Sequence, residues 1–356
     1  MDAEPVRTSI ARRLLDELGV GEAENGDRAR ATTRLCSSPE FAGRVVVIPA
    51  WEERDPSAVA AYFTAVADMV RDLPPADRPR TLVVARLRDV PQGMPDRIDT
   101  TSGTAHWWWG CTTSADTSVV VAMTRSAQHS PDVPEHLRSV QELVAVDVAA
   151  SVAGPDLDLA RHLAAGWDGR VSSLPDLVDG YVEARPPAPE IVWGGPGRHW
   201  SSPPGQLRTG WAQGLVDRWD GQVMVALAAF PADCRRQELS RRIWRGQHRA
   251  LNPLIDMYRS ILEQIVHRRS STRVIELIAA DGRTGRPERP GAGGLPMLEL
   301  NQMRKAVRDL GLRLDPQEKR LLTAGCAVRN SLAHHDPVTD DEIRELLAAA
   351  HAMGVA

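Results

Sequence analysis

The sequence predicts two domains of different class: an α/β domain with a mostly parallel sheet over residues 1–183, and an all-α helical bundle over residues 207–356. The first half contains short aliphatic runs separated by segments of helix length, the order expected for a parallel sheet covered by helices. The second half repeats apolar residues at the 3.6-residue period of amphipathic helices. Proline and glycine are concentrated between the halves, over 184–206, which indicates an interdomain linker or an ordered loop.

Four aliphatic runs are the expected strands, because strands with helices on both faces are apolar at every position. The runs lie at 44–49, 81–85, 117–123 and 142–147. The last run equally fits the end of a helix that starts near Pro134. After the first run, Asp55 and Pro56 predict a helix start, since Asp caps the first turn and Pro fits its first position.

The second half predicts a series of helices, the first of them over 207–217. A long periodic segment over 234–267 contains Pro253, which predicts a kink or break in the turn before it. Asp315-Pro-Gln-Glu318 has the form of a capping box and predicts a helix that runs to Leu332. A second capping box, at 339–342, predicts the last helix of the chain.

Composition and charge exclude several classes of protein. The net charge of -4 gives no global case for nucleic acid, and no run of apolar residues is long enough to cross a membrane. The four cysteines are far apart without a Cys-x-x-Cys pair, which argues against a zinc site or a disulfide scaffold and favours a reducing cytoplasm. With its acidic, polar N-terminus, the chain is therefore expected in the cytoplasm, with no metal and no cofactor.

Lysine is nearly missing, and this excludes a phosphate-binding P-loop. The two lysines, Lys305 and Lys319, follow Arg and Glu, so no Gly-Lys-Ser/Thr sequence exists. The strand–helix–strand order of the first half, with TLVVARLRDVP at 81–91, resembles a degenerate P-loop NTPase domain of the STAND type. The resemblance implies an inactive NTPase-like sensor or scaffold, in which Asp89 has no paired acid that would make it a magnesium ligand.

The strongest candidate for chemistry is Arg329-Asn330-Ser-Leu-Ala-His334, followed by His335, near the end of the helix that starts at Asp315. Asn330 and His334 are four residues apart and share a helical face if the helix continues that far. An arginine can hold a phosphate oxygen and stabilise the charge of a transition state. A histidine, with an ordinary pKa of about 6.5, can move the proton of a ribose hydroxyl.

This motif, with Arg and His at R-x4-H spacing near the end of the penultimate helix of a helical bundle, resembles the HEPN family of bacterial defence and toxin proteins. The likeness covers roughly 235–356. It implies a bundle that dimerises and a composite site that cleaves RNA without metal. By this resemblance Arg329 and His334 are catalytic, and Asn330 is the polar residue of the motif. If the motif is structural, the same residues would instead only cap carbonyl groups and tie two helices together. His335 is an equally placed imidazole, but the motif spacing favours His334, and His335 is expected to be a neighbour or an exposed side chain.

Arginine is concentrated between residues 235 and 273, where ten arginines stand against three acidic residues. Such a basic segment attracts a phosphate backbone without reading its sequence. It equally fits a solvated helix face or pairing with acidic surface of the first half. The expected RNA-binding ridge is formed by Arg236, Arg241, Arg245 and Arg249.

Three adjacent tryptophans, Trp107, Trp108 and Trp109, cannot all face one core. Some of them must meet a domain interface, a partner or a stacked base. His106 and Cys111 flank them, but nothing supplies the third partner that a Cys–His nucleophile needs.

Together these observations favour a two-domain bacterial conflict protein whose C-terminal domain cleaves RNA as a homodimer under control of its N-terminal domain. The alternative is a non-catalytic adaptor or regulator that binds another protein of the same defence system. A third possibility is a DNA-binding regulator with a helix-turn-helix over 207–250.

Overall fold

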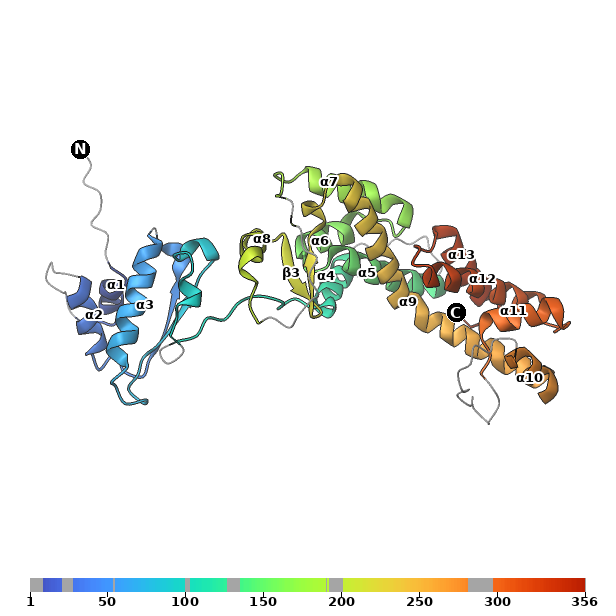
Figure 1. Cartoon of the computed structure of the whole chain (residues 1–356), viewed down its shortest axis with the longest axis horizontal. Helices are drawn as coiled ribbons and strands as arrows, with labels where there is room; N and C mark the ends of the chain where they lie inside the picture. The colour runs from blue at the N-terminus through green and yellow to red at the C-terminus, as the bar shows by residue number, and fades with distance from the viewer. Residues whose placement is uncertain are drawn as a thin grey trace. The chain divides into compact units, whose positions relative to one another are not determined.

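The computed structural model describes residues 9–20, 28–53, 55–99, 103–126, 135–189, 191, 201–280 and 297–355 (Figure 1). The chain divides into two compact units. Unit 1 comprises residues 1–108 and 201–212, and unit 2 comprises residues 109–200 and 213–356. Residues 109–183 thus belong with the C-terminal helices, whereas the sequence placed a boundary at 184–206. Within the expected linker, residues 192–200 lie outside the described residues.

Unit 1 is built around one βαβ element. Strands β1 (Val45–Pro49) and β2 (Arg80–Val84) pair in parallel and are connected through α3 (Pro56–Val70). Asp55 caps α3 as predicted, its side chain accepting a hydrogen bond from the backbone N–H of Ser57 at 2.9 Å. The remaining helices of unit 1 are α1 (Ile10–Glu17), α2 (Arg28–Cys36) and α8 (Arg208–Ala212).

The sheet of unit 1 has one covered face. Ile48 is buried in the core that the sheet forms with α1, α2 and α3. The opposite face exposes four aliphatic side chains, whose exposed fractions are 64% for Val45, 57% for Val47, 53% for Leu82 and 40% for Val84. In the described residues the sheet therefore has two strands and one layer of helices, not the larger doubly covered sheet that the sequence predicted.

Unit 2 is helical apart from one hairpin. Its helices are α4 (Ser114–Ser126), α5 (Glu135–Ala153), α6 (Leu157–Gly166), α7 (Leu174–Glu183), α9 (Ala232–Arg269), α10 (Thr272–Ala280), α11 (Leu300–Asp309), α12 (Pro316–Ala333) and α13 (Asp340–Ala352). Strands β3 (Val216–Trp219) and β4 (Gln222–Val225) form the antiparallel hairpin. Short 3-10 turns lie at Ala50–Glu52, Leu87–Asp89, Met94–Asp96, Val171–Ser173, Gly205–Leu207 and Leu227–Ala229.

Two expected strands are helices in the structure. The 117–123 run lies in α4, whose first turn is closed by a reciprocal capping box. Thr113 N–H donates to Asp116 Oδ2 at 2.9 Å, and Asp116 N–H donates to Thr113 Oγ1 at 3.3 Å. The 142–147 run lies in α5, in agreement with the alternative prediction of a helix that starts near Pro134. The cap of α4 and the packing of both helices in the main core outweigh the strand preference of their valines.

The expected helix over 207–217 is also shorter than predicted. After α8 the chain turns into the β3–β4 hairpin, whose turn consists of Asp220 and Gly221, both with positive φ (48° and 81°). Asp-Gly between two apolar runs is a strong hairpin signal. This hairpin leaves no continuous helix-turn-helix over 207–250.

Helix α9 is a single helix of 38 residues that continues through Pro253, so the expected break is wrong (Figure 1). Its packing against α5 is very close at Gly246. A Cβ atom there would lie 2.5 Å from Val148 Cα and 2.7 Å from the Asp147 carbonyl oxygen. Only glycine allows the two helix backbones to approach this closely.

Arg242 is buried in the same interface, with a relative exposure of 1%. Its guanidinium group donates to Glu238 and to the carbonyl oxygens of Val152 and Val225. It therefore fastens α9 to the end of α5 and to β4. Among the described residues, no helix is both long and apolar enough to span a lipid bilayer.

Candidate functional site

Helix α12 carries the Arg329–His334 motif, and its two ends are fixed by the local sequence. At the start, Asp315 and Glu318 form the predicted capping box, with each side chain accepting from the other residue's backbone N–H at 2.9 Å. At the end, His334 N–H donates to the Asn330 carbonyl oxygen at 3.0 Å. The helical hydrogen bonds therefore extend to His334. This is the condition under which Asn330 and His334 share a helical face.

The three motif residues have different surroundings. Arg329 and His334 are exposed, and in the described part of the chain neither forms an ion pair or a side-chain hydrogen bond. Asn330 is half-buried, and its Oδ1 accepts a hydrogen bond from Asn301 Nδ2 of α11 at 3.2 Å. Asn330 therefore connects two helices of the bundle, while Arg329 and His334 remain open to solvent.

Arg329 and His334 diverge around the helix axis. They are five residues apart, which corresponds to about 140° of rotation in an α-helix. The structure brings Asn330 against α11 but does not bring Arg329 and His334 to a common partner.

A second exposed arginine, Arg304 of α11, lies near the motif. Burial raises the pKa of the Cys326 thiol, and the positive charges of Arg304 and Arg329 oppose that shift. The two positive charges act on this buried thiol from two different helices. Arg304 comes one turn after Asn301, which contacts Asn330. The sequence pattern gave no reason to join Arg304 to the motif, because the two are separated along the chain.

Three aromatic rings pack together beside the end of α12, each contacting pair at a tilted angle. The Trp244 indole of α9 lies 4.5 Å from the His335 imidazole at an interplanar angle of 31°. On the same helix, His248 lies 5.1 Å from Trp244 at 47°. We call these three residues the ring stack. Both histidines of the ring stack are exposed, and Trp244 is half-buried.

The backbone holds the ring stack in place. Trp244 Nε1 donates to the Leu332 carbonyl oxygen at 2.8 Å. Gln247, fully buried, donates to the Val338 carbonyl oxygen at 2.8 Å and accepts from its N–H at 2.7 Å. His335 has a positive φ of 63°, the conformation with which many helices end and which glycine usually adopts. Sequence reasoning noted His335 only as a neighbour and missed Trp244, although Trp244 and His248 have i, i+4 spacing.

The expected basic ridge of α9 is partly neutralised. Arg241 pairs with Glu238 at 2.6 Å, and Arg249 lies 3.9 Å from Asp220. Arg236 and Arg245 form no ion pair within the described ranges. Arg241, Arg245 and Arg249 follow each other at intervals of four residues and lie on one side of α9, whereas Arg236 lies about 140° from Arg241.

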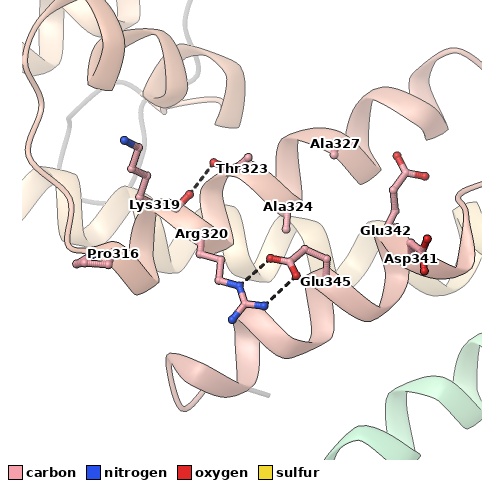
Figure 2. A pocket seen from close by; sticks show the side chains of 9 residues that line it. All are labelled: Pro316, Lys319, Arg320, Thr323, Ala324, Ala327, Asp341, Glu342 and Glu345. Carbon is pink, nitrogen blue, oxygen red and sulfur yellow. Dashed lines mark hydrogen bonds and ion pairs between the residues drawn. The ribbon is translucent and has the colours of Figure 1, made fainter.

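A groove of about 610 Å³ lies between α12 and α13, away from the motif (Figure 2). Thr323, Ala324 and Ala327 contribute small side chains to its lining, and a bidentate ion pair between Arg320 and Glu345 crosses it at 2.7 and 2.8 Å. None of Arg329, Asn330 and His334 lines this groove.

The three adjacent tryptophans have different surroundings, as expected for side chains that cannot all face one core. Trp107 contacts Trp211 edge-on at 5.6 Å, while Trp108 is 76% exposed and Trp109 only 3%. His106 and Cys111 are both exposed and belong to different units, and nothing in the structure joins them into a nucleophilic pair.

The carboxylate of Asp89 forms an ion pair with a neighbouring arginine. Its carboxylate accepts hydrogen bonds from Arg86 Nε at 2.8 Å and Nη2 at 3.0 Å, and these bonds lower the pKa of Asp89. Across the described residues, no group of three or more His, Cys, Asp or Glu side chains is arranged to hold a metal ion.

Comparison with known proteins adds no relative. No family model matches the chain, and neither the curated proteins nor the solved structures contain a match.

Proposed function

We propose that the C-terminal helices form an endoribonuclease of the HEPN type that acts as a homodimer and needs no metal. The observation that carries this proposal is the exposure of Arg329 and His334 at the end of α12, where neither is engaged by a described residue. A purely structural arginine or histidine is expected to cap a carbonyl or pair with an acid. Arg242 and Arg320 do so in this same bundle.

The proposed reaction is transfer of the phosphoryl group to the neighbouring 2′-hydroxyl. His334 removes the proton of the 2′-hydroxyl, whose oxygen then attacks phosphorus while the bond to the 5′-oxygen breaks. Arg329 stabilises the charge that builds on the phosphate oxygens. The products are a 2′,3′-cyclic phosphate and a 5′-hydroxyl, and the 5′-oxygen takes up a proton as it leaves.

The dimer follows from the divergence of the two side chains. One copy would supply Arg329 and the other His334, so that two motifs face each other across one phosphodiester. The setting that we propose is the bacterial cytoplasm, with unit 1 as the sensor or scaffold that controls cleavage.

The test uses Arg329→Ala and His334→Ala with a labelled RNA in the presence of EDTA. Each variant should lose at least a hundredfold in cleavage rate, because each removes a group that acts on the reacting phosphate. Arg344→Ala is the matched control, since Arg344 is an exposed arginine of α13 that pairs with Asp341. Wild-type rates in both motif variants would refute the assignment.

A second function is favoured by a separate observation, the exposed aliphatic face of β1 and β2. Contiguous exposed apolar patches mark interaction surfaces, which fits an adaptor that binds a partner protein of the same system. In that case Val47→Glu should abolish co-purification with a protein encoded by a neighbouring gene, while His334→Ala should leave it unchanged.

A further inference from the structure

We propose that the ring stack of His248, Trp244 and His335 binds a nucleobase of single-stranded RNA. This inference rests on the proposed RNA substrate and assigns a site to the base of a nucleotide next to the cleaved phosphate. Its closeness to the catalytic group is set by the chain, because His335 directly follows His334.

The geometry of the rings suits base stacking. Trp244 is fixed by its hydrogen bond to the Leu332 carbonyl, and His335 lies over it at 4.5 Å and 31°. His335 is exposed, so its imidazole is accessible from solvent to a further planar group. Every base has a flat π face, and a preformed ring platform therefore binds bases with little sequence preference.

The conformation of His335 supports a role for its ring. A positive φ of 63° ends the helix here, and glycine adopts this conformation with the least strain. Termination of α12 therefore does not require histidine at this position. The histidine adds only an imidazole, which stacks on Trp244 and presents a ring nitrogen edge that can hydrogen-bond to a base.

The charges around the ring stack suit a strand of RNA. Along α9, Trp244, His248 and Asn252 form one row at intervals of four residues, and Asn252 Nδ2 lies 2.8 Å from His248 Nε2. Arg245, which forms no ion pair within the described residues, lies about 100° further around the helix. It stands between Arg241 and Arg249, which pair with Glu238 and Asp220. Rings next to cations are the combination by which proteins bind single strands, since bases stack while phosphates meet positive charge.

The experiment measures RNA affinity in the His334→Ala background, where the probe is not consumed. The probes are a short labelled single-stranded oligoribonucleotide and an abasic oligomer of the same length. His335→Gly should bind the normal RNA about 5- to 100-fold more weakly, the range for loss of one stacked base. Its affinity for the abasic oligomer should equal that of the parent, because no base is present to stack.

Salt dependence separates stacking from charge. Because the loss of a stacked base removes no phosphate contact, His335→Gly should weaken binding by the same factor at low and high salt. Arg245→Ala should instead reduce the slope of log affinity against log salt by about 0.7, the value for one phosphate contact on a single strand. Thermal unfolding should show His335→Gly to be at least as stable as the parent, which excludes misfolding as the cause.

The outcomes distinguish this site from the proposed nuclease. If the wild type cleaves RNA and Arg329→Ala does not, but His335→Gly binds both probes like its parent, the base site is refuted and the nuclease stands. If no cleavage occurs, but His335→Gly loses the preference for normal over abasic RNA, the base site stands without the nuclease. If the parent binds both probes equally, or neither of them, the base site is refuted.

Discussion

The Trp244 indole nitrogen lies 2.8 Å from the carbonyl oxygen of Leu332 and donates a hydrogen bond to it. This bond joins the long helix α9 to the last turn of α12, just before His334. The carbonyl groups in the last turn of a helix have no partner within the helix. The Leu332 carbonyl also accepts from the backbone N–H of His335 at 3.3 Å, and the indole adds a second donor from 88 residues away along the chain.

Trp244→Phe should therefore loosen the end of α12 while keeping the ring. We expect a loss of about 1 kcal/mol in the free energy of unfolding, the usual net value of one hydrogen bond. Urea denaturation followed by circular dichroism measures it. Trp108→Phe is the control, because Trp108 is 76% exposed and should change stability by less than about 0.5 kcal/mol. Equal effects of the two substitutions would contradict the role of the bond.

Gly246→Ala should strongly destabilise unit 2. The new methyl group would lie 2.5 Å from the Val148 Cα and would push α5 and α9 apart. Overpacking of this kind costs about 1–3 kcal/mol, and more when backbone must move. Gly180→Ala in α7 is a matched control, since a Cβ there meets nothing within 4 Å. It should stabilise the protein by about 0.5–1 kcal/mol.

Arg242→Ala should also destabilise unit 2, by about 3–5 kcal/mol, because two buried carbonyl groups lose their partner and Glu238 keeps only Arg241. Arg241→Ala removes the other arginine on Glu238, and its side chain is 56% exposed. That control should cost less than about 1 kcal/mol. Chemical denaturation measures the free energy of unfolding of both variants. Similar losses for the two would show that burial of Arg242 contributes little.

The Arg86–Asp89 pair should make stability depend on pH. Hydrogen bonds from Arg86 hold the pKa of Asp89 below its ordinary value of 3.8, so folding favours the ionised carboxylate. The stabilisation is fully present above the unfolded pKa and is lost as the pH falls below 3.8 through the folded pKa. The difference in unfolding free energy between wild type and Asp89→Asn should therefore be largest near neutral pH and shrink in acid.

A control for this pH dependence is Asp68→Asn. Asp68 pairs with Arg71 at 3.3 Å, but the two side chains are 65% and 58% exposed. Water and salt screen such a pair, so the substitution should change stability little at any pH. If Asp68→Asn and Asp89→Asn gave the same pH profile, the Arg86–Asp89 pair would not be the cause.

Arg304→Ala should lower the affinity for RNA and should also make that affinity less dependent on salt. Arg304 and Arg329 are exposed on the neighbouring helices α11 and α12, and Asn301, one turn before Arg304, bonds to Asn330. We therefore expect the two arginines to contact neighbouring phosphates. Removal of one contact should lower the slope of log affinity against log salt by about 0.7. Fluorescence anisotropy measures this slope, with Arg344→Ala as the control. If the slope were unchanged in Arg304→Ala, Arg304 would not be part of the RNA-binding surface.

Local signals predicted much of the fold. The capping boxes at Asp315 and Thr339 and the Asp55-Pro56 helix start are correct, because these signals act through hydrogen bonds within one turn. The aliphatic run at 117–123 failed as a strand because periodicity alone does not separate a buried helix from a buried strand. The Thr113–Asp116 capping box, only a few residues earlier, was the signal that would have corrected it.

The candidate site was less accessible to sequence reasoning. The R-x4-H spacing located Arg329 and His334, but nothing along the chain joins them to Arg304 or Trp244. Those neighbours depend on packing between α9, α11 and α12, which side chains distant in sequence determine. The basic ridge on α9 was similarly overestimated, because Asp220, the partner of Arg249, lies on a hairpin that was not predicted.

The parallel pair of β1 and β2 has a consequence for solubility. In the described part of the chain each strand has one neighbour, so each also carries a row of backbone N–H and C=O groups without a strand partner. Open edges next to an exposed aliphatic face favour strand addition and self-association. Charged substitutions at Val47 or Leu82 should therefore raise the concentration at which the purified protein stays monodisperse.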